Sequence, residues 1–343
     1  MPAAFLASIA FLTSVAFSED RCFKGAVHVH SGRSFDSKGT FEEIETAAQK
    51  AGLDFVVLTD HQPSRKDQSV KKMALLPKTK TLWIDGAEVA PDKKHDFLVL
   101  GGGATNIQWE QGREMEGIKQ AKEKGAVIFL GHLARARPFD HLELADGVEI
   151  FNPHKSAAGF LAQIPRFTHI LISHRKNLDV LWLSLLDPPR KEITVWHRLA
   201  REKNLGILAG NDAHQNIRIF GSLLDPYEQN FRFVNTYVWA AKLTEESILN
   251  ALKTGASYVG FPIIEEAAGF RFKSSGGRLV ADLPAGTTGE IRLFKDNRLV
   301  TVRDNASSVS YETREPGLYR VEVWRRVRRK NRPWIYSNLL RVP

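Results

Sequence analysis

Histidines and acidic residues gather at two short apolar stretches near the start of the chain. His28 and His30 alternate with valines, Asp36 follows in a polar segment, and a second apolar run ends in Asp60 and His61. Because side chains two apart on a strand point to the same side, we expect His28 and His30 to project together. Imidazole and carboxylate groups suit Zn²⁺, Mn²⁺ or Fe, so these stretches predict a metal site.

Four more candidate ligands follow other apolar runs, namely Glu88, His132, Asp212 and His214. Together with the first group, they exceed what a single zinc ion needs, and they suit two or three metals that share Glu88 as a bridge. Such a cluster lowers the pKa of a bound water and holds both the attacking and the leaving oxygen of a displacement. We expect Glu88, Asp212 and Arg135 to take part in catalysis.

The elements that must position these residues alternate between short strands and helices. Strands are expected at 26–30, 54–59, 82–89, 95–102, 126–132, 146–152, 206–214 and 231–239, with a further one or an insertion at 169–174. Helices are expected at 40–51, 113–124, 178–186, 193–204 and 244–253. This alternation predicts a parallel α/β fold, and in α/β barrels the carboxyl ends of the strands carry the chemistry.

Beyond residue 262 the pattern changes to alternation with period two, which predicts a small all-β domain, sandwich-like, over 263–343. This part holds 16 Lys and Arg residues against nine Asp and Glu, so it carries seven of the nine net positive charges of the chain. The run Arg325–Arg332 has the highest density of positive charge in this part of the chain. It predicts either contact with a polyanion or a solvated hairpin; we favour the hairpin, because no motif that reads nucleic acid accompanies the run.

The composition of the 343 residues is that of a globular chain, with 43% hydrophobic and 25% charged residues. Residues 3–17 are uncharged and mostly apolar, so we expect 1–18 to be a signal peptide and the protein to be exported, to the periplasm or outside the cell. A misassigned start or a membrane anchor is the alternative. No later stretch is apolar enough to span a membrane, and Cys22, the only cysteine, allows no intrachain disulfide.

Five motifs in order give the chain a family resemblance: His-x-His with a later Asp, Thr-Asp-His, a strand-end Glu, Gly-His, and Asn-Asp-Ala-His. Over roughly 24–262 the chain resembles the PHP (polymerase and histidinol phosphatase) metallohydrolase superfamily, which implies a distorted (β/α)7 barrel over 19–262. The resemblance implies one metal on His28, His30, Glu88 and Asp212, a second on Glu88 and His132, and a third on Asp36, His61 and His214. His95 is either a further ligand of the second metal or a polar residue at a strand start.

The C-terminal part adds a second resemblance. Residues 316–324 and 332–338 are similar to the β-domain of exported PHP proteins of the CehA/McbA branch, although Ser-Asn-Leu-Leu stands where that branch continues Ser-Asn-Pro. The branch name comes from ester or carbamate cleavage, whereas much of the superfamily hydrolyses phosphoesters. The scissile bond is therefore open.

We interpret the chain as an exported metal-dependent hydrolase, a phosphoesterase that uses metal-bound hydroxide on a small-molecule substrate. A carboxylic ester or carbamate hydrolase and a non-catalytic envelope-binding protein are the alternatives. The side chains of Arg33, Arg135 and Lys155 either bind an anionic substrate group or are solvated. His154 is a candidate for the pocket, Asp60 is expected to orient a ligand, and the sequence leaves open whether Glu149 faces inward.

Overall fold

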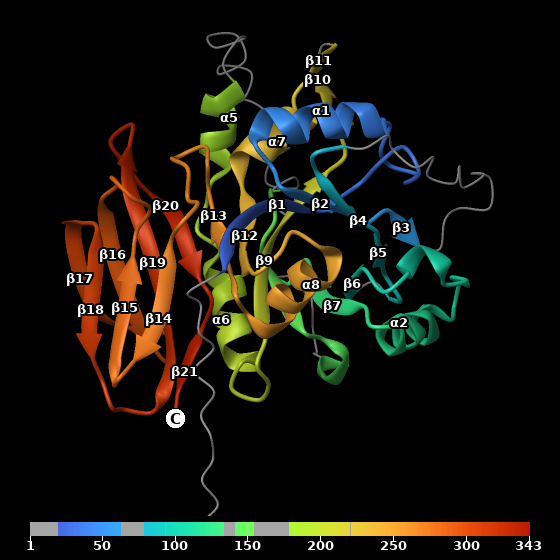
Figure 1. The fold of residues 1–343 in the computed structure, drawn as a ribbon. Coiled ribbons are helices and arrows are strands. Elements are labelled where there is room, and N and C mark those ends of the chain that lie inside the picture. Colours follow the sequence, from blue (N-terminus) through green and yellow to red (C-terminus); the bar gives the residue numbers. More distant parts are fainter. Residues whose placement is uncertain (1–19, 63–78, 93, 134–140, 154–177, 220) are drawn as a thin grey trace, which may run out of the picture.

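The computed structural model describes residues 20–62, 79–92, 94–133, 141–153, 178–219 and 221–343. An α/β part that contains all the helices of these described residues lies beside a set of C-terminal antiparallel strands (Figure 1). The strands of the α/β part are β1 (Arg21–Val29), β2 (Phe55–Leu58), β3 (His61–Gln62), β4 (Leu82–Ile84), β5 (Gly86–Val89), β6 (Asp96–Leu100), β7 (Val127–Gly131), β8 (Gly147–Phe151), β9 (Gly206–Ala213), β10 (Arg218–Ile219), β11 (Ser222–Leu223), β12 (Asn235–Ala240) and β13 (Ser257–Gly260). Its helices are α1 (Phe41–Ala51), α2 (Glu114–Glu123), α5 (Leu178–Leu185), α6 (Arg190–Leu199), α7 (Tyr227–Phe233) and α8 (Glu245–Thr254), with short 3₁₀ turns at Ala104–Asn106 and Leu142–Leu144.

Strand β1 lies at the centre of the largest sheet. It runs parallel to β2 and β9 and antiparallel to β12, and the parallel pairing continues from β9 through β8 to β7. Strand β6 runs antiparallel to both β5 and β7. The connection from β5 to β6 covers only residues 90–95, which is too short for the crossover that a parallel pair needs. The central sheet is therefore mostly parallel, as the sequence predicted, but it is mixed, because β6 and β12 run antiparallel to their neighbours. The predicted seven-unit barrel stays a prediction.

The caps of two helices are as predicted. Thr40 and Glu43 form a capping box at the start of α1, and Gly52 ends the helix with a positive φ of 67°. At the start of α8 the Thr244 hydroxyl accepts a hydrogen bond from the backbone N–H of Ser247. These helices bury their apolar faces against the central sheet, so they fix the strands whose ends carry the candidate ligands.

Three predicted elements differ from the structure. The strand expected at 231–239 is the end of helix α7 followed by β12, because Tyr227 and Phe231 lie one helical turn apart and pack against α1. The strand expected at 82–89 is two strands, β4 and β5, that pair with different neighbours. Helix α6 begins at Arg190, directly after the Pro-Pro break, and not at Ile193.

The C-terminal strands form two layers, as the period-two alternation predicted. They are β14 (Arg271–Ser275), β15 (Arg278–Asp282), β16 (Gly289–Lys295), β17 (Arg298–Ala306), β18 (Ser308–Glu312), β19 (Gly317–Val327), β20 (Lys330–Ser337) and β21 (Leu340–Val342). Strands β14, β15 and β18 make one sheet, and the others extend the central sheet, because β20 pairs with β13. One apolar cluster, with Leu279 and Val309 from the first layer and Leu293 and Val321 from the second, fills the space between them.

The basic run Arg325–Arg332 is a hairpin between β19 and β20, which is the alternative that the sequence favoured. Arg328 and Arg329 occupy its two-residue turn with positive φ angles of 47° and 65°. Arg325 donates to the Thr288 carbonyl at 2.7 Å, so part of the basic run is used within the fold. Contact with a polyanion has no support beyond the charge itself.

Within the described residues, no helix is long and apolar enough to cross a membrane. The expected signal peptide at 1–18 and the expected strand at 169–174 lie outside the described residues.

Candidate metal centre

The first group of candidate ligands is buried at the ends of four strands. His28, Glu88, His132 and Asp212 each bring one ligand atom, and these atoms all lie within 4.8 Å of one another. Nε2 of His28 is 3.1 Å from Glu88 Oε2 and 3.4 Å from Asp212 Oδ1, and Nε2 of His132 is 3.3 Å from Glu88 Oε1. Two imidazoles and two carboxylates around one point are a suitable ligand set for a divalent ion.

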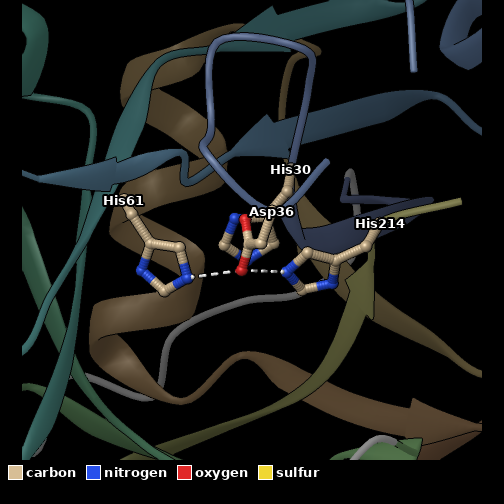
Figure 2. Close-up of side chains that lie close together, drawn as sticks. All are labelled: His30, Asp36, His61 and His214. Carbon is tan, nitrogen blue, oxygen red and sulfur yellow. Dashed lines mark hydrogen bonds and ion pairs between the residues drawn. The ribbon is translucent and has the colours of Figure 1, made fainter. Parts of the chain in front are cut away.

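The second group lies next to the first and includes His30, Asp36, His61 and His214. Figure 2 shows the Asp36 carboxylate between two imidazoles: its Oδ2 is 3.0 Å from Nε2 of His61 and 3.1 Å from Nε2 of His214. The rings of His30 and His214 stack with their centroids 4.0 Å apart. Residues from three distant parts of the sequence thus meet in one place.

Glu88 joins the two groups. Its Oε2 lies 3.2 Å from Nε2 of His30 and 3.4 Å from Nδ1 of His61, in addition to its contact with His28. Asp212 Oδ1 likewise lies 3.5 Å from Nε2 of His30. This is the position expected of a bridging carboxylate. The structure groups His30 with the ligands predicted for the third metal, whereas the resemblance assigned it to the first, so the division among ions stays a prediction.

Three of these ligands have a backbone conformation that side chains rarely adopt. His28, His132 and Asp212 have positive φ angles of 64°, 43° and 49°. At His28 the pairing of β1 with both β2 and β9 shifts register, which marks a bulge. Such conformations cost free energy and are found where a site requires a particular side-chain direction. Here they turn the three side chains toward a common centre.

Glu149 faces inward, which resolves the alternative that the sequence left open. Its Oε1 is 2.7 Å from Nδ1 of His28, and its Oε2 accepts hydrogen bonds from the backbone N–H of His132 at 2.7 Å and from Asn152 Nδ2 at 3.2 Å. A carboxylate on Nδ1 fixes the tautomer in which the Nε2 lone pair is free for a metal. Gly210 makes room for this contact, because a Cβ there would lie 1.6 Å from Glu149 Oε1.

Asp60 holds the loop that carries Asp36 and does not join either group of ligands. Its carboxylate accepts from the Ser31 backbone N–H at 2.6 Å, from Ser31 Oγ at 2.8 Å and from Arg33 Nε at 2.9 Å. Arg33 is mostly buried and also lies 3.6 Å from Asp85. The guanidinium is therefore used to fasten the loop, which is a third role beside the anion contact and the solvated charge considered from the sequence.

The carboxylates change the pKa of the histidines around them. Burial alone would lower the pKa of His28 and His132, but Glu88, Asp212 and Glu149 outweigh it. The pKa of His28 is raised well above its ordinary value, and that of His132 rises to about 9. In return, these histidines hold the pKa of Glu88 well below its usual range in spite of its burial. The carboxylates of the centre therefore favour bound positive charge, which in the absence of metal is supplied by protons on these histidines.

The other residues expected at the site are placed as follows. His95 is buried at the start of β6 and belongs to neither group of ligand atoms; its Nδ1 is 2.8 Å from Asp92 Oδ2. Arg135, His154 and Lys155 lie outside the described residues. All eight residues named as ligands on the strength of their strand-end positions are in the two groups.

No protein-family model matches the chain, and no curated protein matches it in sequence. Among solved structures it is similar to a two-domain protein from Bacteroides vulgatus that contains a predicted PHP-like metal-dependent phosphoesterase. The identity is 16%, 94% of this chain and 96% of the other are covered, and the TM-score is 0.49. A protein from Bifidobacterium adolescentis, provisionally assigned as a metal-dependent phosphoesterase, is 14% identical, with 61% of this chain and 94% of the other covered and a TM-score of 0.32. Likenesses this remote leave the activity of the chain to be argued from its own residues.

Proposed function

We propose that the chain is a metal-dependent hydrolase of the PHP superfamily, in its CehA/McbA-like exported branch, and that it cleaves phosphoesters. One observation carries the proposal: eight His, Asp and Glu residues, in or near strands β1, β3, β5, β7 and β9 and in the loop after β1, form two adjoining groups that contact each other through Glu88. Their order along the chain is that of the five motifs on which the resemblance rests. The proposal includes the distorted (β/α)7 barrel over 19–262 and a separate domain over 263–343.

The ligand atoms of the two groups are better satisfied by bound divalent ions than by contacts with one another. Nε2 of His30 is buried and, among the described residues, makes no hydrogen bond, although Glu88 Oε2 is 3.2 Å away. A metal ion between these atoms would satisfy both. We propose two or three ions of Zn, Mn or Fe, held by the residues of the two groups. Bound divalent ions supply a lowered pKa for coordinated water and stabilise the charge of the transition state.

Residues around the ligands hold the ligand side chains in position. Glu149 holds His28 in one tautomer, and Asp60 fastens the loop that delivers Asp36. Both carboxylates keep ligands in place before a substrate arrives, and such pre-organisation is what electrostatic catalysis requires.

The charge of the centre favours an anionic substrate. The two groups contain three carboxylates, Asp36, Glu88 and Asp212, and five neutral-ligand histidines. Glu149, which contacts His28, adds a fourth carboxylate. Two divalent ions would balance these four negative charges, whereas three ions bring six positive charges and leave a net positive charge. A phosphoester complements that charge better than a neutral carboxylic ester or carbamate, which is the alternative substrate class.

The test is hydrolysis by protein loaded with Zn²⁺, Mn²⁺ or Fe²⁺, on a panel of phosphomonoesters, phosphodiesters, carboxylic esters and carbamates. We expect turnover of a phosphoester that falls strongly in Asp212→Asn, because the variant loses a carboxylate of the first group. The exposed Glu202→Gln is the matched control and should keep full activity. Turnover of carboxylic esters or carbamates alone would move the assignment to the alternative, and no turnover on the panel would contradict the proposal.

We also propose that residues 1–18 direct export. The support is the uncharged, apolar stretch 3–17 followed by small residues. Mass spectrometry of the protein from separated cell fractions tests this: a mature chain that begins near residue 19, outside the cytoplasm, is expected. A full-length chain confined to the cytoplasm would contradict it.

A further inference from the structure

One buried hydroxyl contacts three of the four ligands in the second group. Ser34, in the loop after β1, is only 2% exposed. Its Oγ lies 3.3 Å from Nδ1 of His30, 2.8 Å from Oδ1 of Asp36 and 3.3 Å from the backbone nitrogen of His61. Figure 2 shows these three ligands side by side. Among the described residues, the Ser34 hydroxyl makes no hydrogen bond to a ligand of the first group.

The direction of each of these hydrogen bonds can be assigned, because a hydroxyl has one proton and two acceptor lone pairs. An ionised carboxylate only accepts, so the Ser34 proton points to Asp36, whereas the backbone N–H of His61 only donates. Toward His30 the hydroxyl therefore has a lone pair to offer and no proton. The proton of the neutral His30 ring then lies on Nδ1, and Nε2 carries the free lone pair.

This assignment gives His30 the tautomer that a metal ion needs. Its Nε2 is buried and, among the described residues, makes no hydrogen bond, although Glu88 Oε2 lies 3.2 Å away. Without the hydroxyl, Nδ1–H would lose its acceptor, and the Glu88 carboxylate would favour a proton on Nε2. That proton would occupy the atom that binds the ion. Ser34 thus does for His30 what Glu149 does for His28.

The contact with Asp36 also sets the direction of the other carboxylate oxygen. Because Oδ1 accepts from Ser34, Oδ2 is turned toward the imidazoles of His61 and His214, at 3.0 Å and 3.1 Å. Asp36 lies in a loop, and its side chain is 28% exposed, so little else holds it in place. A carboxylate that is already held loses less entropy when an ion binds.

We propose that Ser34 is a positioning residue of the second group: its hydroxyl fixes the tautomer of His30 and the direction of Asp36, so that an ion can bind there. The proposal rests on the proposed function in taking the two groups to be metal sites, but not on the class of ester that is cleaved. Loss of a hydrogen bond that orients a ligand lowers metal affinity about tenfold to hundredfold. Ser34→Ala should therefore weaken the ion of the second group by this factor and leave the ion of the first group unchanged.

The first measurement is calorimetric titration of Zn²⁺ into the metal-free protein at one fixed pH. Ser31→Ala is the matched control, because this buried hydroxyl of the same loop contacts Asp60 and the Arg33 backbone N–H but no residue of either group. We expect one class of ions to bind about tenfold to hundredfold more weakly in Ser34→Ala, and a smaller change in Ser31→Ala. The ion that keeps its affinity shows that the variant is folded. An unchanged titration, equal losses in the two variants, or a loss spread over all ions would overturn the proposal.

The second measurement is ¹⁵N NMR of the histidine rings in the metal-free protein, which identifies the tautomer of a neutral imidazole without metal or turnover. The signals of His30 are assigned by their loss in His30→Gln. We expect the ring proton on Nδ1 in the original chain and in Ser31→Ala, and on Nε2 in Ser34→Ala. The same tautomer in all three proteins would overturn the role of the hydroxyl. If the original chain binds no Zn²⁺, the proposed metal sites fail, and the tautomer then tests Ser34 alone.

Discussion

Glu149→Gln is the substitution that tests most sharply how the centre is prepared. The glutamate accepts at both oxygens, from the Nδ1–H of His28 on one side and from His132 N–H and Asn152 on the other. A glutamine has the same shape but replaces one acceptor with a donor. If the glutamine NH₂ faces His132 and Asn152, it meets two groups that are themselves hydrogen-bond donors, and their hydrogen bonds are lost. If it faces His28, the imidazole proton moves to Nε2 and blocks the atom that should bind metal.

Either orientation loses at least one hydrogen bond to a charged group in a buried place. Such a loss costs about 1.5–3 kcal/mol, which corresponds to a tenfold to hundredfold loss of metal affinity. Substitution of a residue that orients a metal-binding histidine has an effect of the same size. We therefore expect the affinity of Glu149→Gln for Zn²⁺ to fall by a factor in this range.

The assay is competition for Zn²⁺ against a chromophoric chelator at one fixed pH. Glu202→Gln, an exposed carboxyl in the turn after α6, is the matched control and should keep the affinity of the original chain. Circular dichroism confirms that both variants are folded. An affinity of Glu149→Gln within twofold of the control would refute the role assigned to the carboxylate.

Four further predictions follow from contacts described above. Gly210→Ala should lose at least tenfold in zinc affinity, because its Cβ would overlap Glu149 Oε1; retained affinity in the same chelator assay would show that the strand yields. Metal affinity should rise with pH up to about 9, because below that pH the metal-free protein holds a proton on His132 that a metal ion must displace. Calorimetry in buffers of different ionisation enthalpy should detect the released proton. In the metal-free protein the raised pKa of His132 contributes stability that is complete below pH 6.5 and is lost as the pH rises through about 9. Thr40→Ala should lower the free energy of unfolding by about 1 kcal/mol without changing metal content, as measured by urea unfolding and elemental analysis; an unchanged midpoint would contradict the capping role.

The ligands could be predicted because each follows an apolar run at a strand end. His28, Glu88, His132 and Asp212 are polar residues in or just after otherwise apolar strands, and the edge where such strands end brings them together. The caps at Thr40 and Thr244 were predictable for a similar reason, since their signals are local.

Features that depend on tertiary contacts could not be predicted. Glu149 lies in the middle of a strand, and whether it faces inward depends on a register shift between β8 and β9 that no local pattern indicates. The positive φ angles at His28 and Asp212 are imposed by surrounding structure on residues that could adopt ordinary conformations elsewhere. The aromatic alternation around Phe231 resembled a strand, but packing against α1 favours the helix.

The direction of strand β6 relative to its neighbours could not be predicted from the sequence either. A short apolar run flanked by glycine is compatible with either strand direction, and only the length of the connection 90–95 and the pairing partners decide it.

The central claim is that the two groups of ligands hold at least two metal ions that share Glu88. The most direct measurement is elemental analysis of the purified protein after loading with Zn²⁺ or Mn²⁺ and removal of the excess, beside Glu88→Ala and the control Glu202→Ala. The account predicts two or three ions per chain in the original protein and in the control, and a loss of at least one ion per chain in Glu88→Ala. Fewer than one ion per chain in the original protein, or the same content in Glu88→Ala, would contradict it.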